Sequence, residues 1–220
     1  MLRALLVDDE AVYREIWRDF LSAHPSIEVI GEASDGCIAV QQARALRPDV
    51  VLMDMRMPVM DGVAATAHIC AEHPDIVVLG MSTFTTDDYV VDLLRAGASG
   101  YLVKDTSPAE LVRALHAVSS GDHVLSPAVI GHVVHAVRPS APPLEKTPGA
   151  DLLRTLTSKE LEVIRLLAQG MSNQEMAQAL WVSESTIKAR FVSIMRKLDA
   201  RDRVQVLLKA IDSRLVEVRL

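Results

Sequence analysis

The stretch Val50-Val51-Leu52-Met53-Asp54 places four apolar residues in a row before a carboxylate. A second apolar run, within Ile76–Met81, also lacks the alternation of polar and apolar residues. Strands of this kind are buried on both faces, which is typical of a parallel sheet covered by helices. Three more β-rich runs occur in the same part of the chain: Arg3–Val7, Glu28–Ala33 and Tyr101–Val103. The sequence therefore predicts five short strands.

A segment with helical periodicity follows each of these runs. The segments cover residues 11–23, 36–46, 62–72, 87–96 and 108–120. Five strand–helix repeats with short connections predict a doubly wound α/β domain around a five-stranded parallel sheet. We expect this domain to occupy residues 1–122.

Residues 123–151 are expected to connect two domains. Pro127–Val137 favours one more short helix, and the 14 residues from 138 to 151 include four prolines and a glycine. This composition is typical of a linker that its prolines stiffen in part. Fully extended at about 3 Å per residue, the linker would reach ~40 Å, so the two domains can pack together or separate.

The net charge of −6 conceals an uneven distribution. Residues 1–150 hold 11 Lys and Arg against 20 Asp and Glu, a balance of −9. Residues 151–220 hold 12 against 9, a balance of +3. Such asymmetry is expected when only one domain meets nucleic acid, although +3 alone is weak support.

The sequence also indicates where the protein works. No run of 18 apolar residues is present to span a membrane, and the N-terminus lacks the basic start and long apolar core of a signal peptide. Cys37 and Cys70 have no metal-ligand spacing, which favours free thiols in a reducing compartment. We therefore expect a cytoplasmic protein without a membrane partner.

The pattern is helical throughout from Leu156 onward, which predicts an all-α domain at residues 152–220. Capping boxes at Thr157 with Glu160 and at Ser172 with Glu175 are expected to start two helices.

A helix at Ser172–Leu180, a three-residue break and a longer helix at Glu184–Leu198 form the outline of a helix-turn-helix. We expect Trp181, within the break, to lie in the core beneath the turn. The longer helix has a stripe at the spacing of a buried face: Ile187, Phe191, Ile194 and Leu198. A fourth helix is expected near Arg203–Ser213.

Polar side chains follow the ends of four predicted strands: Asp8, Asp9, Asp54, Ser82 and Lys104. Because the carboxyl ends of parallel strands meet at one edge of a sheet, these side chains are expected to converge. Three crowded carboxylates repel one another unless a cation is present, and Mg²⁺ prefers such oxygen ligands. Asp54 would then be a nucleophile that forms an acyl phosphate, with Lys104 and Ser82 binding phosphate oxygens.

Three stretches resemble the receiver domain of two-component response regulators. They read Leu5-Leu6-Val7-Asp8-Asp9-Glu10, Met53-Asp54-Met55-Arg56-Met57-Pro58 with Asp61-Gly62, and Ala96-Gly97-Ala98-Ser99-Gly100-Tyr101-Leu102-Val103-Lys104-Asp105. The resemblance covers roughly residues 1–122 and implies a flavodoxin-like fold. It also implies that Asp54 accepts a phosphoryl group from a cognate histidine kinase.

The same resemblance implies a metal site and a switch. Asp9 and Asp54 would bind Mg²⁺ directly, Asp8 mainly through water, and Arg56 through its backbone carbonyl. The two positions that reorient on phosphorylation are Ser82 and Tyr101. The added charge is expected to pull Ser82 and Lys104 inward and to let Tyr101 pack into the space vacated.

Residues 155–213 resemble the LuxR-type helix-turn-helix of the NarL/FixJ subfamily of response regulators. The matching stretches are Leu156-Thr157-Ser158-Lys159-Glu160, Gly170-Met171-Ser172-Asn173-Gln174-Glu175, Val182-Ser183-Glu184-Ser185-Thr186-Ile187-Lys188, Lys197-Leu198 and Arg201-Asp202-Arg203. The resemblance implies a transcription regulator that binds double-stranded DNA and forms a homodimer on activation. Arg190 departs from the subfamily, which usually has His there.

The residues expected to contact DNA begin the second helix of this domain or face outward on the third: Asn173, Gln174, Ser185, Lys188, Ala189, Arg190, Val192 and Arg196. Further candidates for phosphate contacts are Lys197, Arg201 and Arg203. The last helix is expected to expose an apolar face for the dimer: Val204, Leu207, Leu208 and Ile211. Packing within the domain is the alternative for that face.

Three alternative functions make different demands on the sequence. A haloacid-dehalogenase-type phosphatase would need a second Asp two residues after Asp54, where this chain has Arg56. We therefore expect no enzyme, apart from slow hydrolysis of its own phosphate. A regulator that works without phosphorylation would not need the complete pocket, and a module that binds protein instead of DNA would show no salt-dependent DNA affinity.

Overall fold

The computed structural model describes residues 1–83, 89–119, 155–213 and 215. By their internal contacts the residues divide into two compact units, Met1–Leu125 and Ser126–Leu220. The linker and short helix predicted within residues 123–151 lie outside the described residues. The exact domain boundaries therefore stay a prediction.

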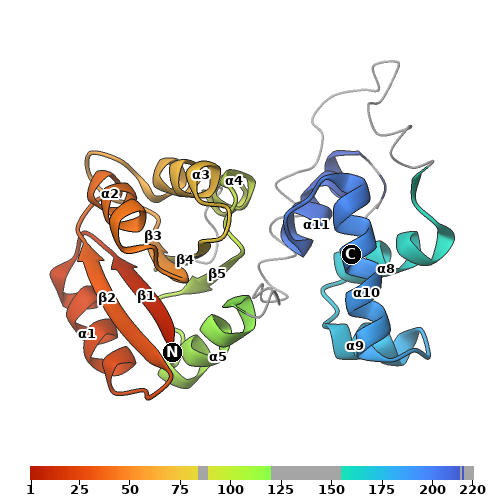
Figure 1. The fold of residues 1–220 in the computed structure, drawn as a ribbon, viewed down its shortest axis with the longest axis horizontal. Coiled ribbons are helices and arrows are strands. Elements are labelled where there is room, and N and C mark those ends of the chain that lie inside the picture. Colours follow the sequence, from red (N-terminus) through yellow and green to blue (C-terminus); the bar gives the residue numbers. More distant parts are fainter. Residues whose placement is uncertain (84–88, 120–154, 214, 216–220) are drawn as a thin grey trace. The chain divides into compact units, whose positions relative to one another are not determined.

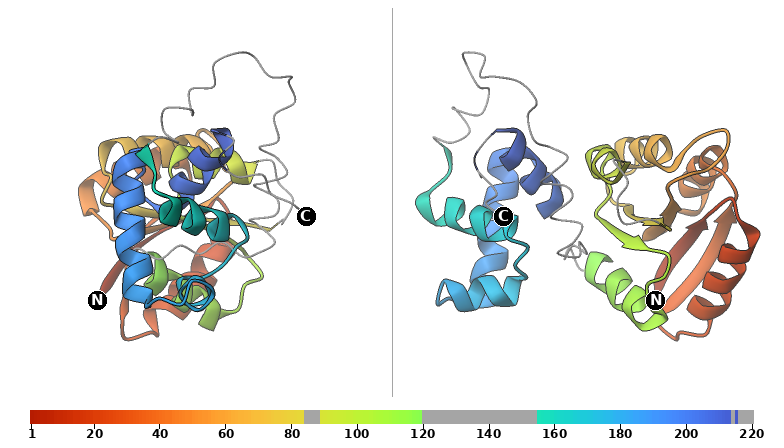
Figure 2. Two further views of the ribbon diagram at one scale, coloured as in Figure 1. Left: turned by 90° about the vertical axis from the view of Figure 1, so that its right-hand side faces the viewer. Right: turned by 180° about the vertical axis from the view of Figure 1, so that it is seen from behind.

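The first unit is a parallel sheet with helices on both faces (Figures 1 and 2). The strands are β1 Leu2–Val7, β2 Ile27–Ala33, β3 Val50–Asp54, β4 Val77–Ser82 and β5 Gly100–Val103, and they lie in the order β2-β1-β3-β4-β5. The helices are α1 Ala11–Ser22, α2 Gly36–Leu46, α3 Gly62–Glu72, α4 Tyr89–Ala96 and α5 Pro108–Ser119. The predicted five-stranded, doubly wound α/β fold is confirmed.

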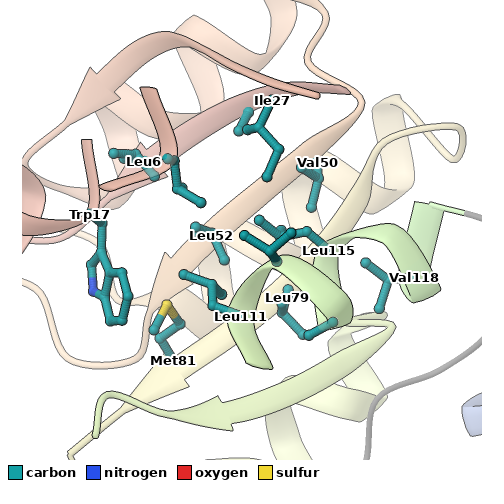
Figure 3. Close-up of a cluster of buried hydrophobic side chains, with 14 residues drawn as sticks. Leu6, Trp17, Ile27, Val50, Leu52, Leu79, Met81, Leu111, Leu115 and Val118 are labelled. Carbon is teal, nitrogen blue, oxygen red and sulfur yellow. The ribbon is translucent and has the colours of Figure 1, made fainter. Parts of the chain in front are cut away.

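Helices α1 and α5 cover one face of the sheet, and α2, α3 and α4 lie on the other (Figure 1). On the first face, Trp17 of α1 and Leu111 and Leu115 of α5 pack with strand residues such as Leu52 (Figure 3). Every residue of β3 is buried. Each buried Leu contributes about 2 kcal/mol, so the apolar run that predicted this strand also explains why it lies at the centre of the sheet.

Strand β4 begins and ends one residue later than the predicted Ile76–Met81. The backbone N–H of Ile76 donates to the carbonyl of His73 at 3.0 Å and closes the turn after α3. Ile76 therefore belongs to the turn, and Ser82 is the last residue of the strand instead of the residue after it.

The strand order determines where a ligand site can form. Strands β1 and β3 are neighbours, with Val7 opposite Met53, although β2 lies between them in the sequence. The chain changes direction across the sheet at this pair, and ligands bind outside the carboxyl ends of the strands at such a switch point. The residues that leave β1 and end β3 are Asp8 and Asp54.

The described residues of the second unit form four helices: α8 Ser158–Ala168, α9 Asn173–Ala179, α10 Glu184–Leu198 and α11 Arg203–Asp212. The capping boxes at Thr157 and Ser172 are both present, and Ser183 and Asp202 accept the N-cap hydrogen bonds of α10 and α11. The predicted stripe of α10 is buried. The predicted helix-turn-helix outline is thus confirmed, with the start of each helix fixed by its own capping residue.

The prediction that Trp181 lies in the core was wrong. Its side chain is 94% exposed, and its backbone is left-handed with φ of 54°. The three-residue turn closes through the N–H of Val182, which donates to the carbonyl of Ala177 at 3.0 Å. This turn leaves the indole of Trp181 on its outer side, and Val182 is the partly buried residue instead.

The expectation of an exposed apolar face on α11 was wrong for three of its four residues. Val204, Leu207 and Leu208 are buried, and α11 packs against α8 and α10. Ile211 alone of the four is partly exposed. Packing within the domain, the alternative for this face, accounts for the three buried residues because α8 and α10 cover them.

A buried carboxylate connects α8 to α10. Glu160 completes the capping box of α8 and also accepts hydrogen bonds from Ser193 Oγ at 2.8 Å and Lys197 Nζ at 2.7 Å. Burial alone would raise the pKa of Glu160, but Lys197, Thr157 and Ser193 together lower it to about 2. The ionised carboxylate therefore stabilises the folded unit.

This network predicts a specific loss of stability in acid. Folding lowers the pKa of Glu160, so its contribution of about 3 kcal/mol is complete above pH ~4.5 and is lost as the pH falls toward ~2. Glu160→Gln should remove most of this contribution at neutral pH, as measured by amide hydrogen exchange in α8 and α10. The matched control is Glu162→Gln, an exposed position of the same helix. Equal protection in both variants would contradict the assignment.

Candidate phosphoryl-accepting site and DNA-facing surface

Three carboxylates meet at the carboxyl edge of the sheet. Asp8 and Asp54 are buried and Asp9 is exposed. One carboxylate oxygen from each lies within 4.8 Å of the others. Three hard oxygen donors at this separation suit a divalent cation such as Mg²⁺. The sequence predicted this grouping, and the adjacency of β1 and β3 explains it.

Lys104 binds two of these carboxylates at once. Its Nζ lies 2.7 Å from Asp8 Oδ2 and 2.7 Å from Asp54 Oδ1, and its side chain is 5% exposed. The backbone N–H of Lys104 donates to the carbonyl of Ser82 at 2.7 Å, which ties the end of β5 to the end of β4. The predicted convergence of Asp8, Asp54, Ser82 and Lys104 is therefore present in the fold.

Burial and charge have opposite effects on these groups. Burial raises the pKa of Asp54, and the hydrogen bond and charge of Lys104 offset only part of that increase. Burial alone would lower the pKa of Lys104, but the carboxylates of Asp54 and Asp8 raise it above its ordinary value. Lys104 is therefore a firm positive charge, beside a carboxylate that burial makes more costly to ionise.

Backbone groups hold the carboxylates in place. Asp54 Oδ2 accepts the N–H of Arg56 at 3.0 Å, and Asp8 Oδ1 accepts the N–H of Glu10 at 3.0 Å. Gly62 begins α3 directly against the backbone carbonyl of Asp54, where a Cβ atom would clash. This clash explains why the Asp61-Gly62 pair belongs to the motif.

The predicted switch residues lie on the two strands that follow β3 in the sheet. Ser82 ends β4 and is buried, and Tyr101 of β5 is 1% exposed. The structure thus shows Tyr101 in an inward position, the one expected for the phosphorylated state. Its movement between two positions stays a prediction.

Sequence reasoning missed two residues of the site. The ring of Tyr13 covers Lys104, with Nζ 4.3 Å from the ring centroid, a distance typical of a cation–π interaction. Arg14 donates from Nη1 to the carbonyl of Asp8 at 2.6 Å. Both residues lie in the first turn of α1, one turn after Asp9, so the helical period could have indicated them.

The outward face of α10 carries most of the residues expected to contact DNA. Five of the eight residues expected to contact DNA lie on it and are exposed: Ser185, Lys188, Ala189, Val192 and Arg196. Gln174 is also exposed, whereas Asn173 and Arg190 are half-buried. The structure therefore presents a mixed polar, basic and apolar surface along the longer helix of the helix-turn-helix.

The further phosphate candidates have partners within the unit, and their contact with phosphate stays a prediction. Lys197 pairs with Glu160, and Arg201 lies 3.3 Å from Asp202. Arg203 donates to the carbonyl of Met171 at 2.9 Å and stacks over the Phe191 ring at 5.3 Å. These contacts hold the helices of the unit together, which the sequence pattern alone did not indicate.

The double ion pair predicts a large effect of removing Lys104. Lys104→Met leaves two buried carboxylates without their cation, which should cost about 3 kcal/mol of unfolding free energy in urea with divalent cations chelated. The double variant Lys104→Met/Asp54→Asn should recover much of that loss because one buried charge is gone. Arg113→Met, at an exposed position of the same unit, is the control. A Lys104→Met protein as stable as the control would contradict the role of this ion pair.

Among the described helices, none is long and apolar enough to cross a bilayer.

Comparison with known proteins identifies both units. Residues 4–116 match the family model for the response regulator receiver domain, and residues 154–210 match that for bacterial regulatory proteins of the luxR family. The chain is 40% identical over 218 residues to the transcriptional regulatory protein LiaR of Bacillus subtilis (strain 168), which covers 98% of this chain and 100% of LiaR. It is 34% identical over 216 residues to the response regulator VraR of Staphylococcus aureus (strain Mu3 / ATCC 700698), covering 98% of this chain and 99% of VraR.

A solved structure agrees with these relatives. The crystal structure of response regulator ChrA of a heme-sensing two-component system is similar with a TM-score of 0.52 and 32% identity, covering 98% of each chain. The carboxylate pocket with its lysine and the helix-turn-helix occur in the two matched segments. The chain therefore belongs to the two-component response regulators of the NarL/FixJ subfamily, with a receiver domain followed by a LuxR-type helix-turn-helix domain.

Proposed function

We propose that this protein is a phosphorylation-controlled transcription regulator whose Asp54 accepts a phosphoryl group from a cognate histidine kinase. The observation that carries the proposal is the position of Lys104, which binds Asp54 and Asp8 together beside Asp9. A basic group held on the nucleophile is positioned to bind an oxygen of the incoming phosphoryl group.

The transfer needs little movement in this geometry. An oxygen of Asp54 attacks phosphorus, the bond from phosphorus to the kinase histidine breaks, and an acyl phosphate forms. The product carries about one more negative charge than the carboxylate and three acceptor oxygens. Lys104 exchanges one carboxylate contact for a phosphate oxygen, and Ser82, at the end of the next strand, supplies a hydroxyl donor.

The carboxylate donors fit Mg²⁺. Asp9 and Asp54 would bind the ion directly, Asp8 through water, and the carbonyl of Arg56 would complete the protein ligands. When bound, the ion supplies positive charge that offsets the crowded oxygens of the transferring group.

A kinase must dock beside the pocket to deliver the phosphoryl group. Helix α1 begins directly after the Asp8-Asp9-Glu10 segment, and it exposes Val12 and Ile16 one turn apart. Val59, in the loop after Asp54, is also exposed. Apolar side chains at the rim of an acidic pocket support a protein as the donor.

The second domain would carry the response to DNA. Its α10 helix exposes Lys188, Val192 and Arg196 on the face that enters the major groove in helix-turn-helix proteins. LiaR and other relatives are transcriptional regulators by name, which supports this output. We also propose that activation produces a homodimer; Ile211 is the predicted dimer residue that stays partly exposed.

The central test is DNA binding with and without a phosphoryl donor. Footprinting on genomic DNA should show sites that the phosphorylated chain protects at lower protein concentration, and Asp54→Asn should not respond to the donor. The affinity should fall steeply with salt because lysine and arginine displace counterions from DNA. A fully active Asp54→Asn protein would favour regulation without phosphorylation, and absence of salt-dependent DNA binding would favour a protein-binding module.

Mg²⁺ should bind the receiver in the absence of any donor. Because the ion binds only the folded pocket, the melting temperature should rise with Mg²⁺ concentration. Asp9→Asn should reduce this shift strongly, whereas Asp61→Asn, which keeps a side chain that can cap α3, should leave it unchanged. Equal shifts in both variants would place the ion elsewhere.

A further inference from the structure

Trp181 departs from two ordinary rules of protein structure. A large aromatic side chain is normally at least half covered in a soluble domain, yet the indole of Trp181 is 94% exposed. Its backbone has φ of 54°, in the left-handed region that favours Gly or Asn. A residue whose exposure and backbone conformation are both unfavourable, and whose side chain makes no stabilising contact in the fold, is expected at a functional position.

The fold does not explain this tryptophan. Among the described residues, the indole makes no hydrogen bond or ring contact, and only the backbone N–H of Trp181 is used, donating to the carbonyl of Gln178 at 3.3 Å. The turn itself is closed by the backbone of Val182. Asn at position 181 would serve this turn equally well, so the indole is not needed to form it.

The position of Trp181 indicates its partner. It lies two residues before Ser183, the N-cap of α10, and so just ahead of the exposed row that includes Ser185 and Lys188. In helix-turn-helix proteins the N-terminal residues of this helix reach base edges in the major groove. A side chain just before that helix meets the wall of the groove, which is sugar and phosphate, instead of its floor.

We propose that the indole of Trp181 packs on the sugar–phosphate backbone of the bound DNA, with Nε1–H donating to a phosphate oxygen. The inference rests on the proposed DNA-binding function and adds a contact that positions α10 in the groove without reading sequence. The indole has one donor and no acceptor, which suits an acidic oxygen. Phosphate contacts from neutral donors fix register and orientation in this way.

Affinity and its salt dependence together test the contact. The full chain and its variants are titrated onto a mixed-sequence DNA duplex about three helical turns long at several salt concentrations. Trp181→Asn should bind about tenfold more weakly, the loss expected for one hydrogen bond to a charged acceptor. Its slope of log affinity against log salt should equal that of the wild type because a neutral donor releases no counterion. Lys188→Ala should instead reduce the slope by about one.

Two variants separate the parts of the contact from an effect on folding. Trp181→Phe keeps an aromatic ring but loses the N–H, so its affinity should lie between those of the wild type and Trp181→Asn. Because Asn accepts the left-handed backbone, the melting temperature of Trp181→Asn should be at least that of the wild type. A weaker binder that is also less stable would overturn the proposal.

Tryptophan fluorescence gives an independent readout. The chain has two tryptophans, and Trp17 is buried in the receiver core. Acrylamide should therefore quench mainly Trp181 in the free protein, and DNA should protect it; Trp17→Phe isolates this signal. Trp181 that is already shielded without DNA would indicate a second copy or another part of the chain as its partner and would overturn the proposal. Wild-type binding with unchanged Trp181 accessibility would also overturn it, while leaving the proposed DNA-binding function intact.

Discussion

The double ion pair of Lys104 is the interaction on which the receiver site depends. A single buried ammonium holds Asp8 and Asp54, which come from neighbouring strands and would otherwise repel one another at close range. Buried ion pairs contribute little net stability because desolvation offsets attraction. The value of this ion pair is positional, since it keeps Asp54, the proposed nucleophile, in contact with Lys104, the group proposed to bind the phosphoryl product.

This arrangement also explains how a local chemical change could spread. The backbone N–H of Lys104 is hydrogen-bonded to the carbonyl of Ser82. Tyr101 is buried in β5, the strand that ends directly before Lys104. In the proposed mechanism, Lys104 exchanges a carboxylate for a phosphate oxygen, and the ends of β4 and β5 would then adjust together. A charge change that biases two packings of one element is a common basis for switching.

The features that could be predicted from sequence are those set by local patterns. The apolar run at Val50–Asp54 identified a central strand with correct bounds, and side chains such as Ser183 fixed the starts of helices. The pocket followed because parallel strands bring their ends to one edge. Each of these predictions needed only the order and spacing of residue types along the chain.

The predictions that failed depend on tertiary contacts. Whether Leu207 is exposed depends on how α8 and α10 pack around α11. Trp181 was assigned to the core because of its apolar character, but its own left-handed backbone in the turn directs the side chain outward. The helical period could have placed Tyr13 near Asp9, but its cation–π contact with Lys104 joins positions far apart in the sequence and needed the fold.

The two domains are built for different tasks. The acidic receiver concentrates negative charge around one buried cation, whereas the smaller domain uses its buried charges, such as Glu160 with Lys197, to fix helices and leaves other cations on α10 exposed. The proposed phosphoryl chemistry and the proposed DNA binding thus belong to different domains. The charge balance is −9 over residues 1–150 and +3 over residues 151–220, which agrees with an acidic receiver and a mildly basic second domain.

The most direct test of the account is to locate the phosphoryl group itself. The full chain is incubated with a small-molecule phosphoryl donor and Mg²⁺, reduced with borohydride, which converts an aspartyl phosphate to homoserine, and mapped by peptide mass spectrometry. The account predicts homoserine at position 54 alone, and its loss when Lys104 is replaced by Met or Asp54 by Asn. Homoserine at Asp8 or Asp9, or a phosphate retained on another type of residue, would contradict it.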